Sequence, residues 1–160
     1  MSPRSNALNS SRESIAAAGH GLAMGLRAAY LTMHRRANAE FAHLGLTADQ
    51  FVILTALAEA DGVTQKELAR RTASDANTMS EMLGRLERRG LVARKRDASD
   101  GRARRVSLTD SGREIRQAAW DGIAAFGDRL AGLVPSAERA DLVGHLERIA
   151  QGMTTLGDDA

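Results

Sequence analysis

With 160 residues, 43% of them hydrophobic, 3% aromatic and two of them proline, the chain is long enough for one domain with appended helices and is expected to be mainly helical. It contains no cysteine, which excludes disulfides, thiol-based redox sensing and cysteine-ligated metals, and residues 1–14 lack the apolar segment of a signal peptide. No apolar run approaches the roughly 18 residues needed to cross a bilayer, so we expect a cytoplasmic protein with no membrane partner. The net charge is +2, but residues 64–113 carry +6 and the remainder −4. Such a local basic patch is typical of nucleic-acid binding, although charge alone leaves open a merely solvated, arginine-rich surface.

The N-terminal part of the chain is expected to be disordered over residues 1–10 and then to form one long helix over residues 11–43. Apolar residues recur there at helical steps of three and four, namely Leu22, Leu26, Tyr30, Met33, Ala37 and Phe41. Gly45 should end this helix. The spacing of Thr47 and Gln50 is that of a capping box, which predicts the start of a second helix.

Two short helices and a hairpin are expected next. Thr64 and Glu67 have capping-box spacing, and after a break at residues 72–73 the N-cap candidates Ser74 and Asp75 open a helix that runs to Arg89. Gly90 is a natural terminator for that helix. Residues 91–96 and 103–108 then favour two strands around a polar, charged turn.

The C-terminal part of the chain predicts two more helices. Thr109 should cap a helix that extends to about Val134, and Pro135 and Ser136 should open the last one. The inward-facing residues of the last helix are expected to be Leu142, Leu146, Ile149 and Met153.

Two helices joined by a tight break and followed by a β-hairpin form the layout of a winged helix-turn-helix, whose second helix enters the major groove of DNA. The outward face of that helix is small, polar and cationic, which suits base edges and phosphates, although an ordinary amphipathic surface helix would look similar. The hairpin adds six basic and two acidic residues between Arg94 and Arg105. The predicted DNA-contacting residues are Ser74, Asn77, Thr78, Glu81, Arg85, Arg88, Arg94, Arg102 and Arg104.

Several motifs in this order carry a resemblance to a known family. They are residues 74–80 (SDANTMS), residues 85–92 (RLERRGLV), the pattern Asp97-x-x-Asp100-x-Arg102, and residues 106–112 (VSLTDSG). Together they resemble the DNA-binding lobe of MarR-type regulators, and the resemblance extends over about residues 20–155. It implies a winged helix-turn-helix lobe over residues 46–109, with residues 11–45 and 110–157 forming a helical dimerisation region.

The resemblance also implies a function. Members of this family bind double-stranded DNA as homodimers on pseudo-palindromic operators, often repress a nearby gene, and are often released by a small aromatic or phenolic effector. Family members that sense peroxide use cysteine, and this chain has none. The resemblance assigns the minor-groove contact of the hairpin to Arg102, while Asp100 is expected to orient the hairpin.

A small-molecule pocket is expected between the long first helix and the DNA-binding lobe. Tyr30, His34 and Asn38 follow each other at steps of four, so their polar groups lie on one stripe of the helix, beside its apolar stripe. Phe51 and Trp120 are candidates to stack against the ring of an aromatic effector. The alternative is that Tyr30 and His34 only cover the edge of a dimer core.

An enzyme is the competing class of function, but the sequence contains few features that would support catalysis. Both lysines lack the preceding glycine of a P-loop, the glycines at residues 19–25 miss the dinucleotide-binding spacing, and no nucleophile-elbow motif occurs. The four histidines never pair as His-x-x-x-His. We therefore expect no catalytic residues, no metal and no cofactor. A ligand-independent or architectural DNA-binding protein remains the alternative within the DNA-binding class.

Overall fold

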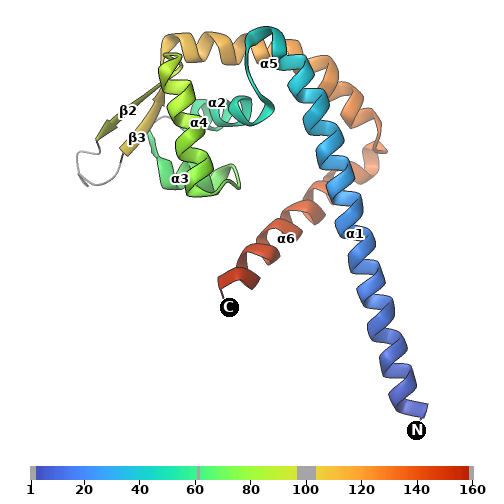
Figure 1. The fold of residues 1–160 in the computed structure, drawn as a ribbon. Coiled ribbons are helices and arrows are strands. Elements are labelled where there is room, and N and C mark those ends of the chain that lie inside the picture. The colour runs from blue at the N-terminus through green and yellow to red at the C-terminus, as the bar shows by residue number, and fades with distance from the viewer. Residues whose placement is uncertain (1–2, 61, 97–103, 159–160) are drawn as a thin grey trace. The chain divides into compact units, whose positions relative to one another are not determined.

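The computed structural model describes residues 3–60, 62–96 and 104–158, with side chains described between residues 15 and 153 outside the same gaps. The chain forms two compact units, residues 1–119 and 120–160. Among its described residues, the first unit holds four complete α-helices, the start of a fifth and a small antiparallel sheet (Figure 1). The fold is mainly helical with a β-hairpin, as the sequence predicts.

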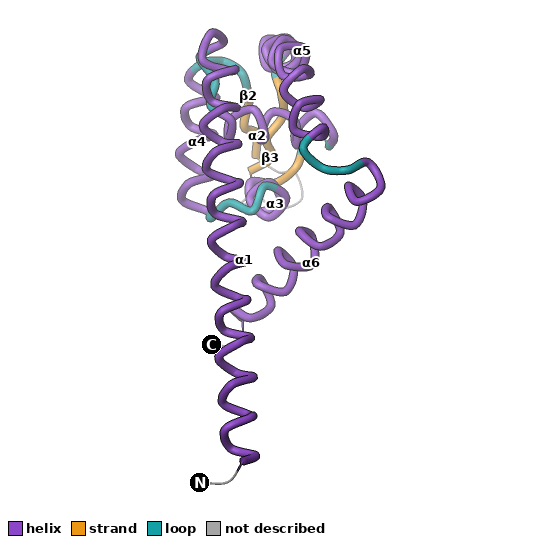
Figure 2. The backbone as a smooth tube through the Cα atoms, turned by 90° about the vertical axis from the view of Figure 1, so that its right-hand side faces the viewer, coloured by secondary structure: helices purple, strands orange, loops and turns teal. Residues whose placement is uncertain are grey.

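The N-terminal helix α1 is continuous from Pro3 to Phe41 (Figure 2). Its start differs from the sequence expectation, because residues 3–10 are helical where the composition indicated disorder. Proline is well tolerated at the first helical position, where its missing N–H has no helical partner to lose. Of the predicted apolar stripe, only Ala37 and Phe41 are buried, so most of α1 leaves its apolar side chains exposed in the single chain.

A tight corner joins α1 to the next helix. The 3-10 turn η1 (Ala42–Leu44) ends at Gly45, whose φ of +64° is in the left-handed region that glycine tolerates best. Helix α2 (Ala48–Glu59) then begins with the predicted capping box, in which Thr47 Oγ1 accepts from Gln50 N and Gln50 Oε1 accepts from Thr47 N.

The helix-turn-helix pair consists of α3 (Gln65–Arg71) and α4 (Ala76–Arg88). Only half of the second predicted capping box forms at α3: Thr64 Oγ1 accepts from Glu67 N, but the Glu67 carboxylate accepts from Arg70 and Arg71 instead. Fully buried residues from four elements form the core of this lobe, namely Ile53, Leu54, Leu57, Leu68, Met79, Leu83, Leu86 and Val106.

The sheet contains β1 (Val63–Thr64), β2 (Val92–Arg96) and β3 (Arg104–Leu108), in the order β1-β3-β2. The β2–β3 hairpin is the predicted wing, with Val92 opposite Leu108. The sequence did not predict β1, because two residues carry no strand periodicity of their own. This strand forms because the backbone groups at the edge of β3 pair with it, so that Val63 lies opposite Val106.

The last three elements are α5 (Asp110–Gly132), the 3-10 turn η2 (Ser136–Glu138) and α6 (Arg139–Asp158). The unit boundary falls inside α5, after Ala119. The apolar residues expected to face inward from α6 are largely exposed in the single chain, with Leu142 41%, Leu146 42% and Met153 65% exposed. Helical periodicity predicts that these apolar residues share one face of α6, but it does not predict which surface covers that face.

Among the described residues, no single helix is long and apolar enough to cross a membrane. One bent pair of segments, Ile15–Leu44 with Ala48–Glu59, passes that test by length and composition alone.

Candidate nucleic-acid interface

The turn between α3 and α4 sets where the second helix of the motif begins. Asp75 is the N-cap of α4: its carboxylate accepts from the backbone N–H groups of Asn77 and Thr78, and from the Thr78 hydroxyl at 2.6 Å. The hydrogen bond from the Thr78 hydroxyl is the main reason why the pKa of Asp75 lies below its ordinary value. Ser74 is half-buried, and its Oγ accepts from Thr72 Oγ1 at 3.2 Å and donates to the Thr72 backbone carbonyl at 3.4 Å. Ser74 and Thr78, both predicted DNA contacts, therefore have structural partners within the chain.

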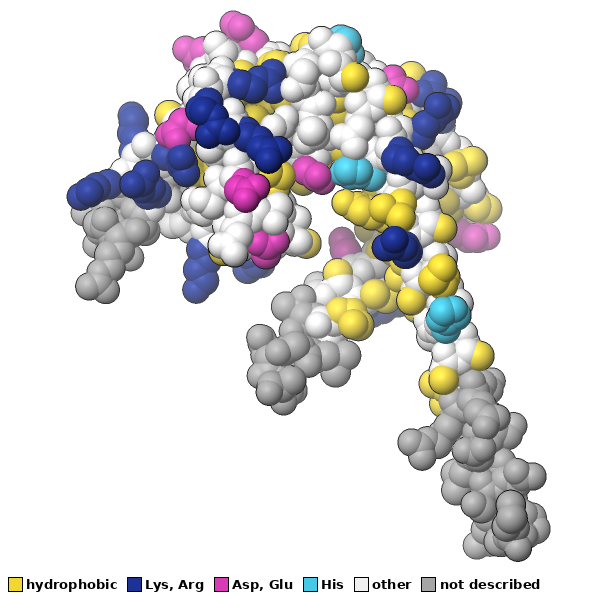
Figure 3. Space-filling model, in the orientation of Figure 1, with side chains coloured by type: hydrophobic (Ala, Val, Ile, Leu, Met, Phe, Trp, Pro, Cys, Tyr) yellow, Lys and Arg dark blue, Asp and Glu magenta, His cyan; other side chains and the backbone are white. Residues whose placement is uncertain are grey.

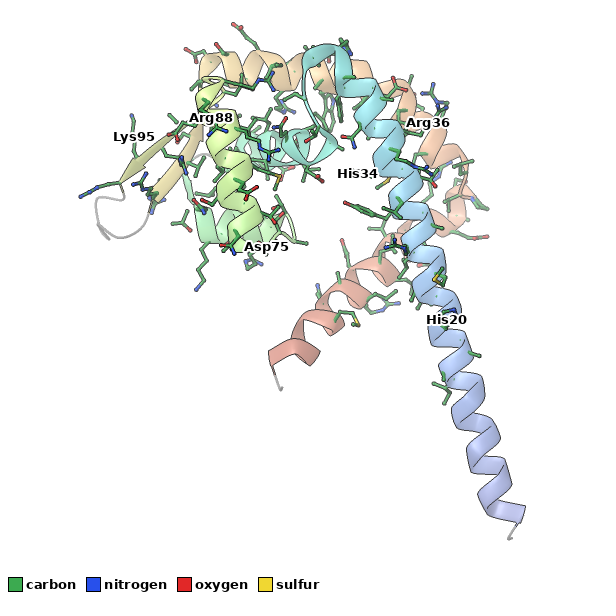
Figure 4. The ribbon with its side chains drawn as sticks, viewed as in Figure 1. His20, His34, Arg36, Asp75, Arg88 and Lys95 are labelled. Carbon is green, nitrogen blue, oxygen red and sulfur yellow. The ribbon has the colours of Figure 1, made fainter. Side chains whose placement is uncertain are left out.

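The outward face of α4 is exposed and carries a shallow groove. Asn77, Glu81, Arg85 and Arg88 are all exposed. The groove has a volume of about 330 Å³ and is lined by Ser80, Glu81, Gly84, Arg85 and Arg88. Figure 4 labels Asp75 at one end of this helix and Arg88 at the other. The face predicted from helical spacing is therefore open, and it presents two guanidinium groups beside one carboxylate.

The C-terminus of α4 is fixed by a full Schellman motif. Gly90 N donates to Glu87 O and Leu91 N donates to Leu86 O, while Gly90 itself has a φ of +69°. These contacts confirm the predicted terminator. They also turn the chain directly into β2, which brings the wing beside the helix.

Arg89 anchors the same end of α4 to the α1–α2 corner. Its guanidinium donates from Nη1 to Gly45 O at 2.7 Å and from Nη2 to Leu44 O at 3.1 Å. Local sequence patterns do not indicate this contact, because its partners lie more than 40 residues away. Arg88 and Arg89 are neighbours in sequence, but only Arg88 lines the outer groove of α4.

An ion pair ties the wing to α4. Arg94 Nε donates to Glu87 Oε2 at 2.8 Å, and Arg94 Nη2 donates to the same carboxylate oxygen. The side chain of Arg94 is only 17% exposed, and hydrogen bonding to it is the main cause of the lowered pKa of Glu87. Arg94 was predicted to contact DNA, but in this fold its guanidinium is directed at Glu87 because β2 runs alongside α4. We therefore treat it as a residue that positions the wing.

The exposed cations of the wing are its other basic residues. Arg104, a predicted DNA contact, is exposed, and so are Lys95 and Arg96, which were not among the predicted contacts. Arg105 is exposed as well, and its Nη1 donates to Gly62 O at 2.7 Å. Arg102, the predicted minor-groove contact, lies outside the described residues. Figure 3 shows Lys and Arg side chains gathered over the wing and the adjoining end of α4.

The base of the wing packs tightly against α5. Thr109 Oγ1 donates to Gly90 O at 2.6 Å and accepts from Gly112 N at 3.0 Å, so one hydroxyl joins the end of α4 to the start of α5. A Cβ on Gly112 would lie only 2.0 Å from Leu91 O, so only glycine fits there without movement. Helix α4, the wing and the start of α5 are thus held as one assembly of backbone contacts.

Comparison with known proteins identifies the family of this assembly. A sequence model of the MarR family matches residues 44–103. The transcriptional repressor Rv2887 of Mycobacterium tuberculosis is 30% identical over 112 residues, which cover 70% of this chain and 81% of that protein. The chain belongs to the MarR family. As the sequence analysis expected, the family and these relatives are transcriptional regulators rather than enzymes.

Other proteins similar to this MarR-family chain include a regulator, a repressor solved with DNA and a regulator solved with a ligand. The regulator HosA of Escherichia coli O157:H7 is 43% identical over 74 residues, which make up 46% of this chain and 55% of HosA, so the match spans about half of that relative. The repressor CouR, solved bound to a 23-mer DNA duplex, is 33% identical with a TM-score of 0.72, covering 79% of this chain and 89% of CouR. PcaV from Streptomyces coelicolor, solved with its natural ligand, is 28% identical with a TM-score of 0.70, covering 81% and 89%.

The residues predicted to bind an effector form a hydrogen-bonded network at the start of α2. Asn38 Oδ1 accepts from Ala48 N at 2.8 Å, Asn38 Nδ2 lies 3.1 Å from His34 Nδ1, and His34 Nε2 lies 3.2 Å from the carboxylate of Asp49. The ring of Tyr30 lies against that of His34, with centroids 5.4 Å apart. His34 and Asn38 therefore join α1 to the N-terminus of α2, whereas Tyr30 contacts His34 within α1; sequence spacing could not indicate this role.

The two predicted aromatic walls differ in their surroundings. Phe51 stacks on Phe41, with ring centroids 4.5 Å apart, and belongs to the α1–α2 contact. Trp120 is 48% exposed and belongs to the second unit. Among the described residues, no group of three or more histidine, aspartate or glutamate side chains could hold a metal ion.

Proposed function

We propose that this protein is a sequence-specific DNA-binding regulator that represses transcription from a pseudo-palindromic operator as a homodimer and is released by a small effector. The observation that carries the proposal is the exposed cationic face of α4 and the wing, with Arg85 and Arg88 beside Lys95, Arg96 and Arg104. A basic face on a helix-turn-helix suits phosphates and base edges, and the CouR–DNA complex supports the same use.

Binding to DNA is tested by its dependence on salt. Each phosphate neutralised contributes about 0.9 to the slope of log affinity against log salt concentration. Two lobes with several exposed cations each should give a slope of roughly 6–10 in magnitude. The measurement is a fluorescence anisotropy titration of a duplex taken from the upstream region of the gene, at several salt concentrations. A slope near zero would argue against DNA as the partner.

The homodimer is supported by apolar side chains that the single chain leaves uncovered. Helix α1 exposes Ile15 by 73% and Leu22 by 53%, and the C-terminal region exposes Leu133 by 80% and Met153 by 65%. Single exposed apolar residues are ordinary, but these recur along helices and would be covered by a two-fold partner. Such a dimer would set two copies of α4 roughly 34 Å apart, one turn of DNA.

Sedimentation equilibrium at micromolar concentration should therefore give twice the 17.1-kDa mass of the chain without DNA. The double variant Leu22→Glu, Leu133→Glu should shift the protein toward monomer while leaving its helical circular dichroism signal in place. A wild-type protein that remains monomeric at these concentrations would contradict the proposal.

Release by an effector would follow from a shift in population. An effector could bind more tightly to a conformation of the dimer in which the spacing of the two DNA-binding lobes does not fit successive major grooves. It would then lower DNA affinity by the ratio of its affinities for the two conformations. Tyr30, His34, Asn38 and Phe51 are the proposed effector contacts in the first unit, and Trp120 remains the prediction for the second. The structure of PcaV with its natural ligand supports the proposal that this protein is a ligand-responsive regulator rather than a ligand-independent one.

The effector is tested with a thermal-shift screen of phenols and aromatic acids, followed by gel shifts with each hit. The double variant His34→Ala, Asn38→Ala should lose the response to the hit. If the hit releases DNA equally well from this variant, the effector site lies elsewhere. If no compound in the screen shifts the melting temperature, the ligand-independent DNA-binding protein becomes the better description.

A further inference from the structure

The outer face of α4 carries an acidic residue whose position is unusual for a surface that approaches DNA. Glu81 is 74% exposed, and its Oε2 lies 3.7 Å from Nη2 of Arg85, which is 62% exposed. Both side chains line the groove of about 330 Å³ on this face. An exposed pair one helical turn apart contributes little to stability, so the fold does not explain why the carboxylate is there.

The other carboxylates of this helix have structural partners. Asp75 caps the N-terminus, and Glu87 holds Arg94 of the wing. Glu81 has only its long contact with Arg85 among the described interactions. On a face that meets phosphates, a carboxylate raises the electrostatic cost of binding unless it accepts a hydrogen bond from the DNA.

Gly84 lies between these two side chains and opens the groove. A Cβ added there would meet Arg88 Nη1 at 3.6 Å, an ordinary contact, so no neighbour in the described part of the chain requires glycine. Glycine inside a helix is nevertheless less favourable than alanine. A missing side chain on an exposed helix face is expected where an outside partner approaches the backbone closely.

Base chemistry accounts for these features together. In the major groove, guanine presents the acceptors O6 and N7, which suit arginine, and cytosine presents its N4 amino donor, which suits glutamate. These groups are adjacent within one G·C base pair, so a neighbouring arginine and glutamate match both partners at once. We infer that Glu81 and Arg85 read one G·C base pair in each operator half-site, with cytosine N4 donating to Glu81 and guanine accepting from Arg85. This inference rests on the proposed function.

The test begins with selection of bound sequences from a randomised duplex pool. Wild-type protein should enrich a motif with a G·C pair at two symmetry-related positions. Glu81→Ala should retain DNA binding but lose the preference at those positions, whereas Glu81→Gln should move it toward A·T because glutamine pairs with adenine. Glu59→Ala, an exposed residue of α2, is the charge-matched control and should leave the motif unchanged.

A second measurement leaves the protein unaltered. Replacing the cytosine of that pair by N4-methylcytosine, or the guanine by 7-deazaguanine, should each lower wild-type affinity by a factor of roughly 5–150. A wild-type motif that Glu81→Ala leaves unchanged at every position, or full affinity for both modified duplexes, would overturn the inference while DNA binding stands. Binding that enriches no motif would instead overturn the proposed sequence specificity, and the inference with it.

Discussion

Gly112 offers the sharpest test of how the wing is attached to the rest of the lobe. Replacing it by alanine would put a Cβ 2.0 Å from Leu91 O, whereas real contacts of this kind are 3.0 Å or longer. The neighbour is backbone and cannot rotate away, so α5 and the start of β2 must separate by about 1 Å. That movement also strains the hydrogen bond from Thr109 N to Leu91 O, now 3.2 Å long.

The size of the effect follows from these contacts. Forcing one extra carbon into a packed contact costs about 1–3 kcal/mol, and a weakened backbone hydrogen bond adds about 1 kcal/mol. The higher helix propensity of alanine offsets this loss of stability by up to about 1 kcal/mol. The net loss of unfolding free energy should be about 1–4 kcal/mol, which corresponds to a fall in melting temperature of about 2–16 °C for a chain of this length.

The assay is thermal unfolding followed by circular dichroism, with Gly127→Ala as the matched control. Gly127 lies in the same helix, and no neighbouring heavy atom of the described residues comes within 4 Å of its added Cβ, so that change should leave stability equal or slightly higher. Below its melting temperature, Gly112→Ala should also bind DNA more weakly, because the wing is displaced. If Gly112→Ala melts within 1 °C of wild type, the reasoning about this contact is wrong.

Three further predictions concern the attachment and stability of α4 and α3. Asp75→Ala should lower the midpoint of unfolding in urea titrations, because two N–H groups of α4 lose their cap, while Asp75→Asn should lower it much less. Glu67 has a pKa lowered from 4.5 to about 2 by hydrogen bonds from Arg70 and then Arg71, so its contribution to stability is present above pH 4.5 and disappears as the pH falls toward 2. Urea unfolding between pH 5 and pH 2 should therefore show a flatter acid limb for Glu67→Gln, and an unchanged limb would contradict this. Arg94→Ala should weaken operator binding by loosening the wing yet leave the salt slope unchanged, whereas loss of a phosphate contact would reduce the slope by about 0.9.

Local sequence signals determined most of the elements of this protein. The capping box at Thr47, the N-cap at Asp75 and the terminator at Gly90 each act through neighbours within a few residues, so their chemistry can be recognised from spacing alone. The outward face of α4 follows equally from helical periodicity, and Arg85 and Arg88 are exposed on it as predicted. Motif order was enough to indicate the MarR family before any contact was known.

The tertiary structure decided what the polar side chains of this framework bind. Arg94 contacts Glu87 rather than solvent because β2 runs beside α4, and Arg89 reaches the carbonyl of Gly45, 44 residues earlier. His34 and Asn38, chosen for their spacing on one helix, contact the start of α2. Spacing along a chain fixes the face of a helix on which a side chain lies. The element that packs against that face depends on how distant segments fold together, and it determines which of the polar groups remain available to a partner.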